Sequence, residues 1–263
     1  MQPESAFFYL SMQCNKAAEM IQGEKDMNIA MIIAGGSGSR MHQDIPKQFL
    51  TVNEKPVIIY TLEVFQRHPA IDEIVIVCIE GWEQVLWAYV RQFNLTKVTI
   101  IVKGGDSGQD SIYRGLREIE TTHQPEDIVL IHDAIRPMVS EEIISDCISK
   151  TVEYGSAIAC IPCAEAMLVS ENQQNSRKVF DRDHLRRTQT PQGFRIGNLM
   201  EIHKKALAKG ITNATASCTL MIEMGEEVYF SKGSEKNLKL TTVEDIDIFK
   251  ALLLAKRAEW LKE

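Results

Sequence analysis

The chain has 263 residues, and its 29 Lys and Arg against 36 Asp and Glu give a net charge of −7. Hydrophobic residues make up 44% and charged residues 25% of the sequence, which is typical of a globular protein and excludes collagen-like or low-complexity chains. An acidic chain is poorly suited to nucleic acid, whose affinity depends on Lys and Arg contacts with phosphate. No apolar run approaches the roughly 18 to 20 residues that a membrane span needs. We therefore expect a soluble protein that binds neither nucleic acid nor a membrane.

Residues 1–27 are expected to form an N-terminal extension that precedes the folded domain. The apolar run Ala6–Leu10 is short and follows Glu4 instead of a basic segment, so a secretory signal is not expected. A chain that starts at Met27 is expected to fold and to work.

The six cysteines are scattered along the chain. Cys160 and Cys163 have the spacing of a redox or zinc motif, but no second pair and no nearby His accompanies them. This pattern is typical of reduced thiols, and it favours a cytoplasmic location.

Short β-branched segments alternate with amphipathic segments of helical length in the first 161 residues. Strands are expected at Ile29–Ile33, Glu73–Cys78, Val98–Val102, Ile128–Ile131 and Ala157–Ile161. Helices are expected at Val57–Arg67, Gly81–Phe93, Gly108–Ile119 and Glu141–Tyr154. Several of the strands are apolar throughout, as in strands that are covered on both faces. The alternation predicts an α/β fold with a doubly wound, mostly parallel sheet.

The pattern changes after Pro162. Residues 164–189 are polar and lack helical periodicity, and a connection of this length is usually functional or contacts a partner. The remaining expected elements are helices at Ile196–Lys209 and Ala214–Met224, a strand at Val228–Ser231 and a final helix from about Val243 to Trp260. Residues 28–263 are therefore expected to form one domain, with a projecting arm at about 164–189.

A glycine-rich loop, Ala34–Met41 (AGGSGSRM), follows the first expected strand. Its main chain can approach a phosphate closely, because glycines carry no Cβ. Met41 stands where a dinucleotide-binding loop needs its third glycine, and no Gly-Lys pair follows as in a P-loop. Arg40 and Lys47 place positive charge just beyond the loop. Main-chain amides with fixed cations suit a nucleoside triphosphate, and a tight turn without a ligand is the alternative.

The sequence resembles the cytidylyltransferases that form CDP-polyols, which have a nucleotide-diphospho-sugar transferase-like fold. The resemblance runs from Asn28 to the final helix, and its motifs are Ala34–Met41, Pro46–Gln48, Gly104–Ser111, Ile131–Pro137 (IHDAIRP), Arg187–Phe194 (RTQTPQGF) and Asn237–Thr241 (NLKLT). It implies an enzyme that uses Mg²⁺ to transfer CMP from CTP to a polyol phosphate, with release of pyrophosphate. The acceptor would be 2-C-methyl-D-erythritol 4-phosphate, on a route to isoprenoid precursors, or D-ribitol 5-phosphate, on a route to surface polymers.

The resemblance also implies roles for individual residues. The residues that would bind the nucleotide are Ala34, Gly35, Gly36, Ser37, Gly38, Gly105, Asp106 and Ser111. The residues that would act in catalysis are Arg40, Lys47 and Lys239, where Lys239 also holds the acceptor phosphate. Arg182 and Thr190 would contact the acceptor, and the arm would reach the neighbouring subunit of a homodimer.

Asp133 would be the magnesium ligand, since a carboxylate is a hard oxygen donor. Its position just after a buried strand equally fits a helix cap. His132 is expected to be structural, because a phosphate monoester is largely dianionic at neutral pH and needs no general base.

The sequence departs from the family pattern at several positions. Gly108 replaces a common Arg, Glu165 and Ala166 replace Asp-Thr, and Thr212-Asn213 replaces Thr-Asp. The last two departures fall on the acceptor side of the site, so the class of reaction is better defined than the acceptor. The alternatives are a CTP or CDP-polyol sensor without activity and a nucleotidyltransferase for another sugar phosphate. Met41 disfavours an NAD-dependent oxidoreductase.

Overall fold

The structure is a computed structural model that describes residues 26–36 and 45–260. Its central sheet has seven strands in the order β11-β7-β10-β6-β1-β4-β5. Their bounds are β1 (Asn28–Ala34), β4 (Glu73–Cys78), β5 (Val98–Lys103), β6 (Ile128–Asp133), β7 (Ser156–Pro162), β10 (Arg186–Arg195) and β11 (Phe230–Lys232). Only β10 among them runs antiparallel to its neighbours β6 and β7. The predicted mostly parallel α/β sheet is confirmed.

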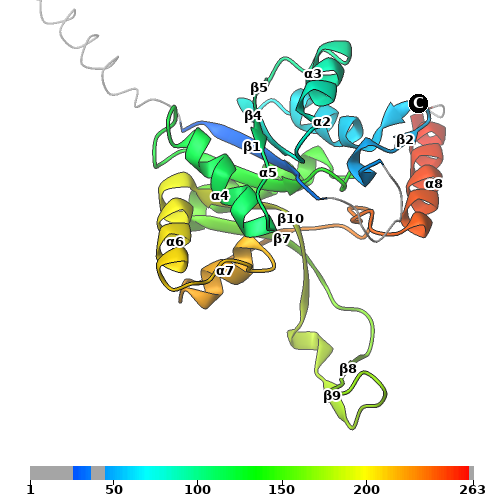
Figure 1. Ribbon diagram of the computed structural model, residues 1–263. Coiled ribbons are helices and arrows are strands. Elements are labelled where there is room, and N and C mark those ends of the chain that lie inside the picture. Colours follow the sequence, from blue (N-terminus) through cyan, green and yellow to red (C-terminus); the bar gives the residue numbers. More distant parts are fainter. Residues whose placement is uncertain (1–25, 37–44, 261–263) are drawn as a thin grey trace, which may run out of the picture.

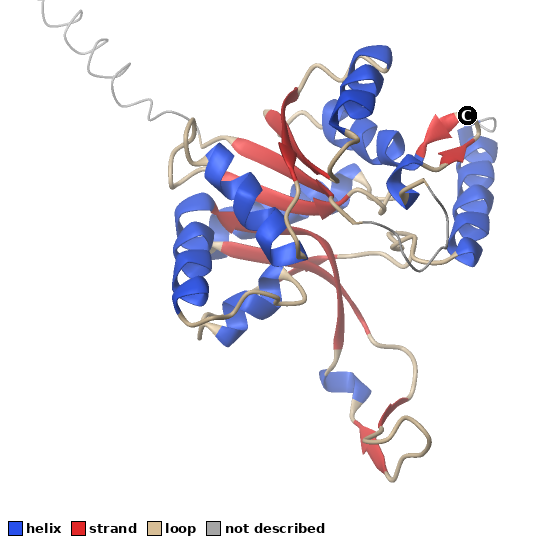
Figure 2. Ribbon diagram, viewed as in Figure 1, coloured by secondary structure: helices blue, strands red, loops and turns tan. Residues whose placement is uncertain are grey.

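Helices cover both faces of this sheet (Figures 1 and 2). The helices are α2 (Val57–Arg67), α3 (Glu83–Gln92), α4 (Gly108–Ile119), α5 (Glu141–Tyr154), α6 (Ile196–Ala208), α7 (Ser217–Glu223) and α8 (Val243–Trp260). Along β1, Ala30 and Ile32 pack with α2, α3 and α5 on one face, whereas Ile29 and Met31 pack with α4, α6 and α7 on the other. Successive residues of a strand point to opposite faces, so a strand buried on both sides must be apolar throughout.

A third apolar cluster joins α8 to the edge of the domain. Phe249 of α8 and Leu240 are buried against Val52 and Val57. Val52 belongs to a small hairpin of β2 (Thr51–Val52) and β3 (Lys55–Pro56), which follows a short 3₁₀ helix at Lys47–Phe49. The cluster therefore holds the segment before α8 close to Lys47.

Strand β10 is the main element that the sequence pattern does not reveal. It carries Pro191 and several polar residues, and proline is normally confined to edge strands or bulges because it cannot donate a ladder hydrogen bond. The pairing of β10 with β7 accordingly shifts register between Thr188 and Gln192. Residues 186–189, expected to belong to the arm, therefore lie in the sheet, and Gln189 is buried.

The segment between β7 and β10 projects from the body of the molecule (Figure 1). It forms a hairpin of β8 (Met167–Val169) and β9 (Lys178–Phe180), followed by a 3₁₀ turn at Arg182–His184. The apolar side chains of this hairpin are exposed: Met167 40%, Leu168 63%, Val179 73% and Phe180 45%. None of the described residues covers these side chains.

The expected N-terminal extension, residues 1–27, lies outside the described residues except for its last two positions. Within the described ranges, none of the helices has the length and apolar character needed to cross a lipid bilayer.

Phe194 tests the contribution of β10 to the core, because its side chain is fully buried between the sheet and α6. We expect Phe194→Ala to lower the free energy of unfolding by about 3–5 kcal/mol, the usual result of leaving a large cavity. Phe230→Ala is the matched control, since Phe230 is 55% exposed and its loss should change stability by less than about 0.5 kcal/mol. Urea denaturation measures both values, and equal effects would contradict the central position of β10.

Candidate active site

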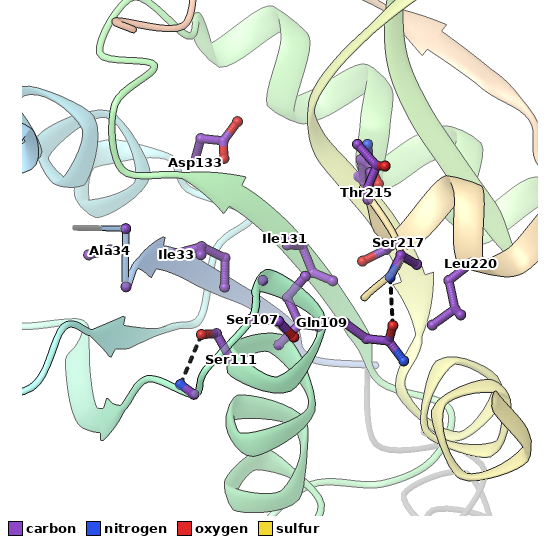
Figure 3. A pocket seen from close by; sticks show the side chains of 18 of the residues that line it. Ile33, Ala34, Ser107, Gln109, Ser111, Ile131, Asp133, Thr215, Ser217 and Leu220 are labelled. Carbon is purple, nitrogen blue, oxygen red and sulfur yellow. Dashed lines mark hydrogen bonds between the residues drawn. The ribbon is translucent and has the colours of Figure 1, made fainter. Parts of the chain in front are cut away.

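A cavity of about 600 Å³ opens at the carboxyl ends of β1 and β6, where open α/β sheets usually bind their ligands. Figure 3 shows Ala34 and Asp133 at these two strand ends, with Ser111 and Gln109 on α4 and Thr215 across the cavity. The predicted residues that line it are Ala34, Gly35, Gly36, Lys47, Gly105, Asp106, Ser111, Asp133 and Lys239. Segments that are distant in sequence thus meet in one cavity.

Two glycine loops form one wall of the cavity. An added Cβ on Gly35 would lie 3.2 Å from Ser111 Oγ, and one on Gly104 would lie 3.1 Å from the carbonyl oxygen of Cys78. Ser111 Oγ accepts a hydrogen bond from the Gly105 amide at 3.0 Å. Glycine suits these positions because Ser111 and the end of β4 approach the two loops closely, and its lack of a Cβ leaves the main chain open to a ligand.

Gln48 holds the first glycine loop in place. Its Nε2 donates to the carbonyl oxygens of Ala34 at 2.7 Å and of Gly36 at 3.1 Å. No role for Gln48 was predicted from the sequence. Its place next to Lys47 in the Pro46–Gln48 motif was the available signal. The predicted residues Ser37, Gly38 and Arg40 lie outside the described residues.

Lys47 and Asp133 bring opposite charges to the cavity. Lys47 is only 8% exposed and lines the cavity from the short 3₁₀ helix. Asp133 pairs with Lys239 Nζ through Oδ1 at 3.1 Å and with Arg136 Nε through Oδ2 at 3.0 Å. Burial alone would raise the pKa of Asp133, but the cationic groups of Lys239 and Arg136 outweigh it and lower this pKa below the usual value. The carboxylate is therefore ionised.

Arg136 is a residue that the sequence analysis missed. It lies three positions after Asp133 in the IHDAIRP motif, and its Nη1 also donates to the carbonyl oxygen of Asn237 at 2.8 Å. It links the end of β6 to the segment that carries Lys239. An Arg three residues from the expected metal ligand was the signal available in the sequence.

Thr190 and Arg182 do not line this cavity. Thr190 Oγ1 accepts from the Asp133 amide at 3.0 Å and lies 3.1 Å from His132 Nδ1. Arg182 lies in the arm, where its Nη1 donates to the carbonyl oxygen of Ala164 at 2.6 Å, and the arm projects away from the central sheet (Figure 1). The acceptor contacts expected of both residues stay predictions.

The positions that depart from the family pattern lie in different places. Gly108 lines the cavity at the start of α4, and an added Cβ there would meet nothing within 4 Å. Ser107 caps α4 by accepting from the Asp110 amide at 3.1 Å. The segment 214–217 lines the cavity, including Thr215, and Asn213 immediately precedes it. Glu165 and Ala166 are exposed in the arm.

Two buried histidines border the site, and both are neutral at pH 7. Burial lowers the pKa of His132 to about 4, and its ring nitrogens approach Thr190 Oγ1 and the carbonyl oxygen of Arg136. Burial also lowers the pKa of His203 to about 4. His203 stacks on Tyr113 with ring centroids 5.7 Å apart, and neither of its ring nitrogens has a hydrogen-bond partner among the described residues.

The fold and the site together define a nucleotidyltransferase of the doubly wound α/β class. Residues 28–255 match the family model described as "IspD: 2-C-methyl-D-erythritol 4-phosphate cytidylyltransferase". The chain therefore belongs to the IspD family of cytidylyltransferases, which confirms the family and the class of enzyme predicted from the motifs.

Individual relatives agree with this assignment. The chain is 43% identical to a ribitol-5-phosphate cytidylyltransferase of Lacticaseibacillus paracasei, over 88% of this chain and 99% of that protein. It is 35% identical to a 2-C-methyl-D-erythritol 4-phosphate cytidylyltransferase of Clostridium botulinum, over 86% of this chain and 97% of that protein. The crystal structure of 4-diphosphocytidyl-2C-methyl-D-erythritol synthase from Anaerococcus prevotii superposes with a TM-score of 0.73 at 26% identity, covering 87% and 99% of the two chains.

The buried histidines make stability depend on pH. The unfolded chain takes up protons on His132 and His203 below about pH 6.5, whereas the folded chain does so only near pH 4. The unfolded state therefore binds more protons in this window, and the free energy of unfolding falls as the pH drops from 6.5 to 4, by up to about 3 kcal/mol for each histidine.

Urea denaturation at several pH values tests this dependence. We expect His203→Phe, which preserves a ring against Tyr113, to lose less stability between pH 6.5 and 4 than the unaltered protein. His184→Asn is the control, because the His184 side chain is 81% exposed. If the free energy of unfolding falls equally with pH in His203→Phe and in the unaltered protein, the lowered pKa of His203 is contradicted.

Proposed function

We propose that the chain transfers CMP from CTP to D-ribitol 5-phosphate, which gives CDP-ribitol and pyrophosphate. The observation that carries this proposal is the meeting of Lys47, Asp133 and Lys239 with the two glycine loops in one cavity. The acceptor is inferred from the curated relatives, since those named for ribitol 5-phosphate reach 39–43% identity and those named for methylerythritol phosphate reach 35%.

The reaction joins an oxygen of the acceptor phosphate to the α-phosphorus of CTP and breaks the bond from that phosphorus to the pyrophosphate oxygen. Negative charge gathers on the α-phosphate oxygens during this exchange. Lys47 is the described cation that is both buried and in the cavity wall, so its ammonium group is suited to stabilise that charge. Lys239 Nζ, held by Asp133, is suited to hold the acceptor phosphate.

The proposed reaction uses Mg²⁺, and Asp133 is the residue that would bind it. The described residues contain no cluster of three or more His, Cys, Asp or Glu side chains that could hold a metal alone. An ionised carboxylate in the cavity wall nevertheless fits Mg²⁺, which is commonly held by one or two carboxylates together with substrate phosphates. The bound ion would supply charge neutralisation at the phosphates.

We also propose that the protein works in the cytoplasm. The described cysteines, including Cys160 and Cys163, are all free thiols. Unpaired thiols are typical of a reducing compartment.

Release of pyrophosphate tests the reaction and the acceptor together. The protein is incubated with CTP, ATP, GTP or UTP and with D-ribitol 5-phosphate, 2-C-methyl-D-erythritol 4-phosphate or other sugar phosphates. We expect release with CTP and D-ribitol 5-phosphate, and loss of release when EDTA removes Mg²⁺. Release with methylerythritol phosphate alone would overturn the acceptor, and binding of CTP without release in any mixture would favour a sensor.

The variant Lys47→Ala tests the role of the buried cation. We expect kcat to fall on the order of a few hundred-fold while KM for CTP changes little, because the contact acts mainly in the transition state. Lys204→Ala is the matched control, since Lys204 makes a surface ion pair with Glu120. A parallel loss of kcat and CTP affinity in Lys47→Ala would contradict this role.

We further propose a homodimer formed through the arm. The exposed apolar side chains of β8 and β9 form a patch on a projecting hairpin, and such patches usually mark contact surfaces. Arg182 follows this hairpin directly. In a homodimer it would lie close to the partner subunit and could reach the acceptor there.

Light scattering after gel filtration tests the dimer. We expect the unaltered protein to be a dimer and Leu168→Asp/Val179→Asp to raise its dissociation constant by about a hundredfold or more, since each apolar side chain contributes about 1.5–3 kcal/mol when buried. Val152→Asp is the control, because Val152 is 56% exposed on α5. A dimer that the arm variant leaves intact would contradict the proposed interface.

A further inference from the structure

A chain of hydrogen bonds runs beneath the cavity between the main chains of Asp133 and Arg136. The Asp133 amide donates to Thr190 Oγ1 at 3.0 Å. Thr190 Oγ1 lies 3.1 Å from His132 Nδ1, and His132 Nε2 lies 3.3 Å from the carbonyl oxygen of Arg136. Thr190 comes from β10 and the other three residues from the end of β6 and its following turn, so two strands are joined here.

The direction of each bond follows from chemistry. A carbonyl oxygen only accepts, so the bond to Arg136 requires the hydrogen of His132 to be on Nε2. His132 is fully buried, and with its hydrogen on Nε2 the ring leaves Nδ1 as an acceptor. The Thr190 hydroxyl must then donate to Nδ1 while its oxygen accepts from the Asp133 amide. Its one hydrogen is committed to His132.

A second set of bonds returns to the same residues. Arg136 Nε donates to Asp133 Oδ2, and Arg136 Nη1 donates to the carbonyl oxygen of Asn237. Asn237 Nδ2 donates to the carbonyl oxygen of Thr190 at 2.9 Å. The two sets form a closed network around Asp133, and Lys239 lies two residues beyond Asn237. The position of the carboxylate and of its Lys239 partner is therefore tied to Thr190 and His132.

We propose that Thr190 and His132 are positioning residues that fix the Asp133 carboxylate against Lys239. The effect on catalysis rests on the proposed function, whereas the hydrogen-bond assignment does not. Misplacement of a reacting group by about 1 Å can cost on the order of a hundredfold in rate. Removal of the Thr190 hydroxyl would leave two buried groups, the Asp133 amide and His132 Nδ1, without a partner.

The kinetic test uses Thr190→Val, which keeps the shape and removes the hydroxyl, and Thr190→Ser, which keeps it. We expect Thr190→Val to lower kcat about a hundredfold with less than a threefold change in KM for CTP or acceptor. Thr190→Ser should stay within about threefold of the unaltered enzyme. Combining Thr190→Val with His132→Phe should lower kcat no further than His132→Phe alone. A selective rise of acceptor KM in Thr190→Val, with kcat preserved, would overturn the proposal.

Nitrogen NMR of the His132 ring tests the assignment without activity. At pH 7 we expect a neutral His132 ring with its hydrogen on Nε2. The Nδ1 signal should move in Thr190→Val but not in Thr190→Ser. The Asp133 amide should exchange its hydrogen with solvent faster in Thr190→Val alone. Hydrogen on Nδ1 would overturn the proposal even if CMP transfer is observed. If the His132 ring has its hydrogen on Nε2 but the protein transfers CMP to no acceptor, only the proposed function is refuted.

Discussion

The arrangement of the site depends on one carboxylate that two cations hold at the end of a buried strand. Burial would drive Asp133 toward its neutral form, and Lys239 and Arg136 prevent this. Arg136 also bonds the carbonyl oxygen of Asn237, and the Leu240 amide donates to the carbonyl oxygen of Ile135 at 2.9 Å. The segment before α8 is thereby fixed to the turn after β6, which places the exposed Lys239 at the cavity.

The antiparallel strand β10 connects the Asp133 carboxylate to the arm and to the segment that contains Asn237. It lies between β6 and β7, and it begins where the arm returns to the sheet. Gln189 and Thr190 on this strand both bond to Asn237. The same strand therefore connects the exposed apolar hairpin to the residues that bond to Asp133 and Asn237. The arm is thus joined directly to residues that position the site.

The sequence predicted the parallel part of the fold because each strand there is covered on both faces and is apolar throughout. Strand β10 was not predicted, because Pro191 and the polar residues around it do not give the pattern of a buried strand. This strand is stabilised by long-range pairing with β6 and β7. The sequence placed Lys47, Asp133 and Lys239 in one site through the motifs. It could not show that Arg136 shares Asp133, or that the Thr190 hydroxyl faces inward, because both depend on contacts between distant segments.

The two halves of the cavity differ in what they require of the sequence. The wall formed by Gly35, Gly36 and Gly105 offers mostly main-chain groups, so it needs only small residues that allow close approach. The rest of the lining, which includes Thr215 and Lys239, presents side chains to the cavity. Under the proposed function, substitutions among these side chains would change the acceptor without disturbing the glycine loops. Relatives named for two different polyol phosphates, both similar to this chain, are consistent with that division.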